Sequence, residues 1–174
     1  MKRWVWILCC LWLLVGCAAP ADDTGLGVGR SSPEAAVDGF LEDLNLALRD
    51  PSLTEGATQR SWAERLAGYF APDERVDQRV AFSEMLAGFA DTSRNPIFGN
   101  RATLEITYSR IEILNREGNE ALVHVVDGSF NLRWLNEQGD VIRERTGGLT
   151  EVIGQPSGGI PVIQVDGLWY LTEG

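Results

Sequence analysis

The sequence is short of the residue types that most enzymes use for covalent chemistry. Among its 174 residues, lysine occurs only at position 2 and histidine only at position 124. The lack of lysine beyond the N-terminus excludes a P-loop lysine, a Schiff-base lysine and pyridoxal phosphate chemistry. A single histidine excludes histidine-rich zinc or iron sites, and no Gly-x-Ser-x-Gly motif marks a nucleophile elbow. We therefore expect a protein that is not an enzyme and that holds no cofactor and no metal.

Cysteine is confined to the N-terminal segment, at Cys9, Cys10 and Cys17. This segment opens with two basic residues and continues as an apolar run from Trp4 to Leu14. A short cationic start, followed by an apolar run too short for the ~20 residues that span a bilayer, is typical of a secretory signal peptide. The sequence therefore predicts export from the cytoplasm.

The end of the apolar run, Leu14-Val15-Gly16-Cys17, resembles the lipobox of bacterial lipoproteins. The resemblance implies that a lipid is attached to Cys17 and that cleavage occurs just before it, so no disulfide is expected in the mature chain. We expect a signal peptide over residues 1–16, the lipidated cysteine and a flexible tether over 17–30, and one folded domain over 31–174. The protein would be anchored to the cell membrane by its lipid and would face the periplasm or the cell exterior.

Positive charge is also scarce. The chain has 15 lysine and arginine residues against 25 aspartate and glutamate residues, and the loss of Lys2 and Arg3 with the signal peptide changes the formal charge from −10 to −12. This composition argues against a nucleic acid partner, because binding a polyanion needs a basic stripe that releases counterions. Anionic lipid headgroups would also repel the domain, so membrane attachment would depend on the lipid anchor.

Helical patterns fill the first half of the expected domain. Ser32-Pro33 is a helix start, and the helix that follows has an apolar face and ends at Asp50-Pro51; the face consists of Val37, Phe40, Leu41, Leu44 and Leu48. A second helix is expected from Gln59 to Phe70. A third is expected from about Glu74 to Ala90, with Val76, Val80, Met85, Leu86 and Phe89 as its apolar side. On the first helix, Glu34, Asp38 and Glu42 form an acidic face, which we interpret as solvated rather than as a metal site.

After Asn95-Pro96 the hydrophobic period changes to two, which indicates strands. One strand runs from Leu104 to Ile113 with a β-bulge expected near Ser109-Arg110. The next is expected from Ala121 to Leu135, with a core face of Leu122, His124, Val126, Gly128, Phe130, Leu132 and Trp134. Turns are expected at residues 117–119 and 137–140. A strand from Val141 to Ile153, kinked at Gly147-Gly148, and a hairpin around Asp166-Gly167 complete the pattern.

Helices followed by a bent meander predict an α+β domain, with N-terminal helices packed on a curved antiparallel sheet of four to five strands. The element order, the opening motif from Ser32 to Phe40 and the closing motif from Val165 to Leu171 resemble the nuclear transport factor 2-like superfamily, and in particular its small exported lipoproteins of unknown function. The resemblance implies a cone-shaped fold with one pocket between helices and sheet. Members range from isomerases and dehydratases to non-catalytic binders, so the fold does not decide the function.

Five side chains are candidates to line such a pocket: Tyr69, Tyr108, His124, Trp134 and Trp169. We expect His124 to be buried on the core face of its strand and hydrogen-bonded to a tyrosine such as Tyr69 or Tyr108. A role as general base or ligand contact is the alternative. His124 and Asp127 are an odd number of residues apart in one strand, so they should point to opposite sides and form no dyad. Trp169 is expected to anchor the last strand in the core.

Three functions remain open on these observations. The first is a non-catalytic interaction or assembly module with a protein partner that the sequence does not identify. The second is a binder of a small apolar or lipidic ligand in the conical pocket, since large aromatics can line such a site as well as fill a core. The third is a pocket enzyme of the isomerase or dehydratase type, for which no catalytic set can be assigned residue by residue.

Overall fold

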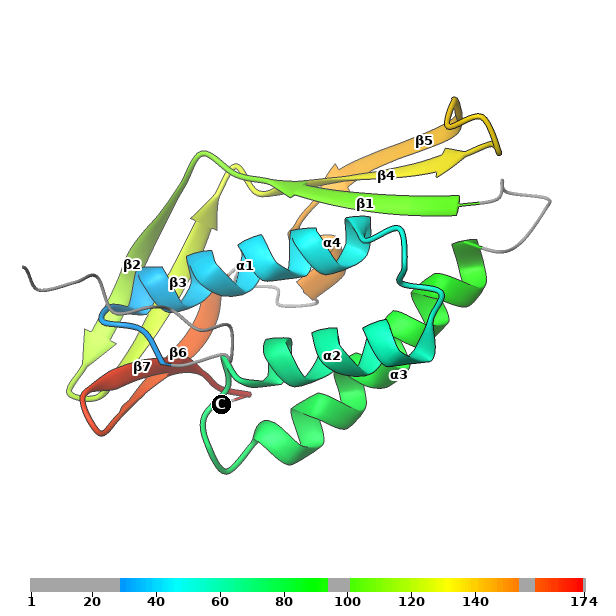
Figure 1. Cartoon of the computed structure of the whole chain (residues 1–174). Helices are drawn as coiled ribbons and strands as arrows, with labels where there is room; N and C mark the ends of the chain where they lie inside the picture. Colours follow the sequence, from blue (N-terminus) through cyan, green and yellow to red (C-terminus); the bar gives the residue numbers. More distant parts are fainter. Residues whose placement is uncertain (1–28, 94–100, 154–158, 174) are drawn as a thin grey trace, which may run out of the picture.

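Three long helices, one single-turn helix and two antiparallel sheets make up the domain in a computed structural model that describes residues 29–93, 101–153 and 159–173 (Figure 1). The predicted α+β class is confirmed. Cys17, the signal peptide and most of the tether lie outside the described residues, so these remain predictions. Within the described ranges, no helix is long and apolar enough to cross a membrane. The elements are α1 (Pro33–Arg49), α2 (Gly56–Ala67), α3 (Arg75–Ser93), β1 (Arg101–Thr107), β2 (Arg110–Glu117), β3 (Glu120–Val126), β4 (Ser129–Leu135), β5 (Val141–Gly148), α4 (Thr150–Ile153), β6 (Gly159–Val165) and β7 (Leu168–Leu171).

Helix α1 forms as its sequence predicts. The Ser32 hydroxyl accepts a hydrogen bond from the backbone N–H of Ala35 at 3.2 Å, and Pro33 occupies the first turn, where its missing N–H costs nothing. The predicted apolar face packs into the core, with Val37 and Leu41 fully buried. Helix α2 begins at Gly56, three residues before the expected start at Gln59.

Helix α3 buries only part of the apolar side that the sequence predicts. Leu86 is buried and Phe89 packs against the core, as expected, but Val76, Val80 and Met85 are exposed. Ala90, Phe82 and the polar Gln78 complete the buried side. Two apolar stripes exist on this helix, and the amide of Gln78 interrupts the one that is buried. The Gln78 amide donates to the Glu173 carboxylate at 2.6 Å. Glu173 is 95 residues away in sequence, so the local residue pattern cannot predict this contact.

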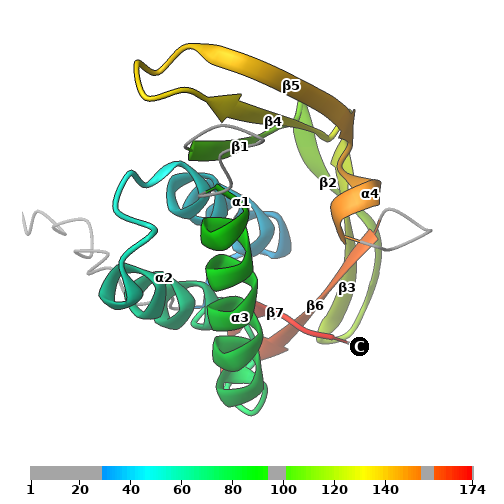
Figure 2. The same cartoon turned by 90° about the vertical axis from the view of Figure 1, so that its right-hand side faces the viewer.

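The strands form two sheets, of order β1-β4-β5 and β2-β3-β6-β7, rather than the single expected sheet of four to five strands. The reason is that two paired segments of chain both bend: the one that forms β1 and β2, and the one that forms β3 and β4. The chain passes from β1 to β2 through Ser109 and from β3 to β4 through Asp127. Ser109 fixes the bend by donating its N–H to the Val126 carbonyl at 3.0 Å and its hydroxyl to the Asp127 carboxylate at 2.9 Å. Together the sheets form an arc around the helices (Figure 2).

The same bend changes which face of the chain is buried. Ala121, Val123 and Val125 are the core residues of β3, whereas Phe130 and Trp134 are buried in β4. Asp127, with φ of 55°, breaks the extended backbone between the two strands and reverses the alternation. The predicted core face was therefore wrong for β3 and right for Phe130 and Trp134 of β4.

Local irregularities also differ from the expected ones. The register shift on β2 lies between Ile113 and Asn115, not at Ser109-Arg110, where the chain bends instead. The strand expected from Val141 to Ile153 ends at Gly148 and is followed by the single turn of α4. A side chain at Gly147 would place its Cβ 2.6 Å from the ring of Phe130, which explains why glycine stands there.

Strand β7 closes the second sheet, as the hairpin signal predicted. Asp166 and Gly167 both take positive φ, 51° and 84°, in a two-residue turn between β6 and β7. Trp169 is 2% exposed, which confirms it as a core residue of the last strand. Arg30, expected at the end of the tether, exchanges two backbone hydrogen bonds with Trp169, of 2.9 and 2.7 Å. Arg30 therefore belongs to the folded part of the chain.

Candidate functional site on the hairpin of β4 and β5

The five candidate pocket residues lie in separate places. The hydroxyl of Tyr69, in the turn after α2, donates to the Asp43 carboxylate at 2.8 Å, and that of Tyr108, between β1 and β2, donates to Asp38 at 2.6 Å. Both carboxylates belong to α1. The expected hydrogen bond between His124 and one of these tyrosines is therefore not formed.

Burial and these carboxylates make both phenols weaker acids. The pKa of Tyr69 is raised to about 12, first by burial and then by the hydrogen bond to Asp43. Burial and the hydrogen bond to Asp38 raise the pKa of Tyr108 in the same way. Both side chains therefore stay protonated at neutral pH and act as hydrogen-bond donors that fix α1, not as bases.

His124 lies on the opposite side of β3 from the core. It is partly buried and stands across from Glu112 in β2, so the prediction of a core histidine was wrong. Trp134 and Trp169 are both buried, but in different sheets. Three surface pockets lined by described residues, of about 370, 520 and 490 Å³, include none of the five side chains.

A buried ion pair in the helical layer was missed by the sequence analysis. Asp43 is 4% exposed and accepts two hydrogen bonds of 2.6 Å from the Arg65 guanidinium, in addition to the one from Tyr69. The Tyr69 hydroxyl in turn accepts from Arg30 at 3.0 Å. The cluster joins α1, α2 and the start of the folded chain. Its acceptor atoms are occupied by protein donors, so we interpret it as structural.

The hairpin of β4 and β5 is the part of the domain that extends furthest from the helices (Figures 1 and 2). Its turn forms because Asn136 and Asp140 bond to each other: the Asn136 N–H donates to the Asp140 carbonyl at 2.9 Å, and the Asp140 N–H donates to the Asn136 side chain at 2.8 Å. Gly139 supplies the positive φ of 89°. The expected turn at residues 137–140 is therefore confirmed.

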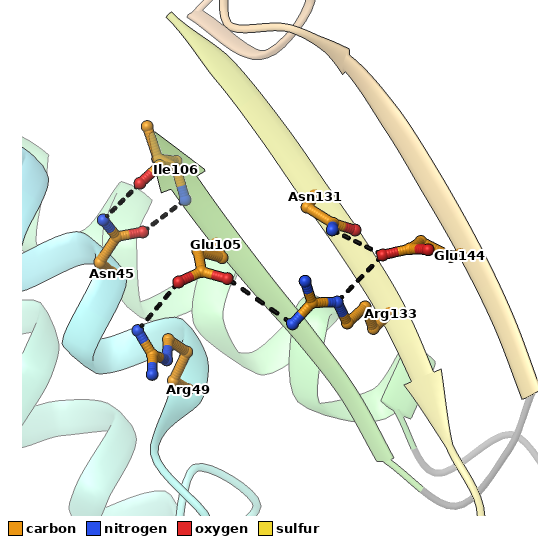
Figure 3. A network of polar contacts seen from close by, with 7 residues as sticks. All are labelled: Asn45, Arg49, Glu105, Ile106, Asn131, Arg133 and Glu144. Atoms are coloured by element: carbon orange, nitrogen blue, oxygen red, sulfur yellow. Dashed lines mark hydrogen bonds and ion pairs between the residues drawn. The ribbon is translucent and has the colours of Figure 1, made fainter. Parts of the chain in front are cut away.

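A line of charged side chains crosses one face of the three-stranded sheet (Figure 3). Glu105 of β1 lies between Arg49 of α1 and Arg133 of β4, at 3.4 and 3.6 Å. Arg133 and Asn131 donate to Glu144 of β5 at 3.1 and 2.6 Å. These hydrogen bonds, that of Asn131 first, lower the pKa of Glu144. Alternating charges therefore connect helix α1 to the outermost strand.

The other face of the hairpin carries two arginines stacked on aromatic rings. The guanidinium of Arg143 lies 4.9 Å from the ring centroid of Trp134, and that of Arg145 lies 5.7 Å from that of Phe130. Such cation–π contacts bring a polar covering to rings that are otherwise apolar. Because both rings are buried, the exposed groups on this face are the two guanidiniums, and arginine is enriched where proteins bind each other.

The two outer edges of this sheet differ. At the β1 edge, the side-chain amide of Asn45 donates to the Ile106 carbonyl at 2.8 Å and accepts from the Ile106 N–H at 2.6 Å, as a neighbouring strand would (Figure 3). At the β5 edge, no other described strand pairs with the chain. All of β5 is exposed except Gly147, and Val141 and Ile142 are 52% and 53% exposed. The β5 edge is therefore available to pair with another polypeptide.

Comparisons with known proteins add no assignment: no family matches the chain, and no curated protein is significantly similar to it. The function must therefore be argued from the chemistry of the site. Within the described residues, no group of three or more histidine, cysteine, aspartate or glutamate side chains could hold a metal ion. What the hairpin offers is main-chain hydrogen bonding along one edge, with arginines on one face and a charge ladder on the other.

Proposed function

We propose that this protein is a lipid-anchored extracytoplasmic lipoprotein whose single domain is a non-catalytic interaction module. The lipobox-like sequence ending at Cys17 supports the anchor. The order of three helices followed by curved antiparallel sheets supports a cone-shaped fold of the nuclear transport factor 2-like type. The observation that carries the interaction function is the uncovered edge of β5 on a hairpin that extends beyond the helices.

The mode of interaction would be strand addition. An extended segment of the partner would lie along β5 and form main-chain hydrogen bonds, while its alternate side chains meet the two faces of the hairpin. On one face they would meet Arg143 and Arg145, and on the other they would meet Glu144. Main-chain bonds would supply affinity, and these charges would select the partner.

A second copy of the chain fits this edge poorly. In an antiparallel pair of two β5 strands centred on Glu144, Glu144 faces its own copy and Arg143 faces Arg145. Centring the pair on Arg143 places that arginine opposite itself. Like charges directly opposite each other destabilise a strand pair. The charges on β5 therefore oppose self-pairing, as edge charges commonly do, and favour a strand from a different protein.

Site-specific crosslinking in the organism that makes the protein would test this function. A photoreactive residue would replace Ile142 on β5 in the full chain, and a matched variant would carry it at Leu46, which is 55% exposed on α1. We expect a crosslinked species of defined mass from position 142 and none from position 46. Equal crosslinking at both positions, or none at 142, would contradict the proposal.

The anchor has a separate test. Cells expressing the wild-type chain or the Cys17→Ser variant would be labelled with a fatty acid, and the protein would be followed in membrane and released fractions. We expect label and membrane retention only for the wild type. Label that persists in the variant would show that Cys17 is not the lipid site.

A further inference from the structure

A groove runs over the outer face of the four-stranded sheet, away from the β4 and β5 hairpin. It consists of two adjoining pockets of about 370 and 520 Å³, which share Ile163 and Thr172. The first lies over β2, β3 and β6, and the second lies between β6 and residues 71–74, in the turn between α2 and α3. The groove therefore connects the turn of β2 and β3 to the start of α3.

The floor of the groove is apolar, and no helix among the described residues covers it. Leu122 of β3 and Pro161 of β6 are paired in the sheet, and Ile163 and Val165 follow on the same face of β6. All four are partly buried. The opposite face of these strands carries the core residues, such as Val123, to which α1 packs. A partly exposed apolar strip on the outer face is a common feature of binding surfaces.

The rim of the groove is negative at both ends. Glu117 and Glu120 stand directly opposite each other in the pair of β2 and β3, and Asp73 and Glu74 line the far pocket. Of the described side chains that line the two pockets, none is basic. Like charges directly opposite each other in a strand pair are unfavourable. A cation placed between Glu117 and Glu120 would remove this repulsion.

One of these carboxylates already has a structural role. Glu74 accepts hydrogen bonds from the Thr172 hydroxyl and from the N–H of Glu173, the latter at 3.1 Å, and so fixes the end of the chain along the groove wall. Asp73 and Glu120 are exposed. The groove therefore has an ordered wall and charged groups at each end that face the solvent.

The charge of the chain restricts what the groove can bind. A second copy would bring a further formal charge of about −12 and would be repelled, as would an anionic lipid surface or a nucleic acid. The apolar floor between two acidic ends fits a ligand whose apolar group lies between cationic ones. The combined length of two pockets suits an extended chain better than a single side chain.

We propose that this groove binds an extended basic segment of a partner polypeptide. An apolar side chain of the segment lies on the floor between Leu122, Pro161 and Ile163. Arginine or lysine side chains flank it, one near Glu117 and Glu120 and the other near Asp73. This site is separate from the β5 edge, and neither proposal depends on the other.

Peptide binding to the full-length protein in detergent would test the site. The probes are fluorescein-labelled peptides Arg-Arg-x-Arg-Arg, in which x is leucine, valine or phenylalanine, and the measurement is fluorescence anisotropy at 150 mM salt. We expect binding by at least one of them, and about tenfold weaker binding to a Glu117→Gln/Glu120→Gln variant, because two exposed ion pairs are lost. Both positions are exposed, so the variant should keep its fold.

Two controls separate a built groove from general attraction to an acidic protein. A Glu42→Gln/Glu137→Gln variant makes the same charge change at exposed positions outside the groove and should bind as the wild type does. A penta-arginine peptide lacks the apolar residue and should bind about tenfold more weakly than the best probe. The proposal is overturned if no probe binds, if the control variant weakens binding equally, or if penta-arginine or spermine binds as tightly as the apolar probes.

Discussion

Helix α1 covers the β1 edge of the three-stranded sheet, whereas no described strand pairs with the β5 edge. At β1, one asparagine side chain on α1 supplies both a donor and an acceptor to Ile106, and Arg101 donates to the carbonyl of Arg49 at the end of α1. At β5, the backbone faces outward and the neighbouring side chains are charged. The comparison shows that one side-chain amide can satisfy the backbone hydrogen bonds of an edge residue in place of a neighbouring strand. The β5 edge carries exposed arginine and glutamate side chains instead.

The largest effect is expected where the chain is most enclosed. Trp169→Ala should lower the free energy of unfolding by about 3–5 kcal/mol, because the side chain is buried in the core beneath the four-stranded sheet. Denaturant titration would measure it. The matched change Trp134→Ala on the projecting hairpin should cost less, because Trp134 lies outside the core cluster to which Trp169 belongs. Equal losses would remove the distinction between the two sheets.

Alkaline pH should lower the stability of the domain through Tyr69, which bonds to helix α1. The folded-state pKa of Tyr69 is about 12 against an ordinary value of 10.0, so the unfolded chain loses its proton first. The stabilisation is complete below pH 10 and is lost as pH rises toward 12. Unfolding titrations between pH 9 and 11 should show falling stability, with a shallower slope in Tyr69→Phe. An unchanged slope in that variant would contradict the role given to Tyr69.

The closed β1 edge can be opened by one substitution. Asn45→Ala should cost about 1–3 kcal/mol, because it leaves the N–H and carbonyl of Ile106 without their partner. Asn45→Asp keeps an acceptor for the N–H but places a carboxylate oxygen against the Ile106 carbonyl oxygen, so its loss should be at least as large. Thermal unfolding and hydrogen exchange at Ile106 would measure both. If exchange at Ile106 stays slow in Asn45→Ala, the amide does not protect this edge.

The smallest effect is expected at the open edge. Ile142→Lys should change stability by less than about 0.5 kcal/mol, because the side chain is already exposed to solvent. Leu104→Lys on β1 is the matched change on the covered strand and should be far more damaging, because Leu104 packs against the core. Similar denaturation midpoints for the two variants would contradict the difference between the edges.

The sequence predicts most elements because their signals are local. The cap and apolar face of α1 and the turn at Asp166-Gly167 each depend on residues within a few positions. The burial of β3 does not, because it depends on the positive φ of Asp127. The adjacent Gly128 indicates that the strand can bend there, but it does not indicate that the buried face changes. One residue with a positive φ shifts the alternation, so the side chains on its two sides that share a parity in sequence lie on opposite faces. His124 was therefore assigned to the core, although the same pattern was correct for Phe130 and Trp134.

The candidate site was harder to predict than the fold. Asp43 lies on the same helix as the acidic residues Asp38 and Glu42, and nothing in its spacing shows that Arg65 and Tyr69 enclose it. The β5 edge was equally hidden, because alternating residues predict a strand without telling which neighbours it has. Edges and buried charges are set by tertiary arrangement, so they became visible only in the structure.

The pair of hydrogen bonds between Arg30 and Trp169 has a mechanical consequence if the chain is held by a lipid at Cys17. A pull on the tether would reach the domain at Gly29, beneath the ring of Tyr170, and would next strain the two bonds to Trp169 before it reached the first turn of α1. These two backbone hydrogen bonds would break one after the other rather than together. Tension on the tether would thus reach Trp169 in the core before it reached helix α1.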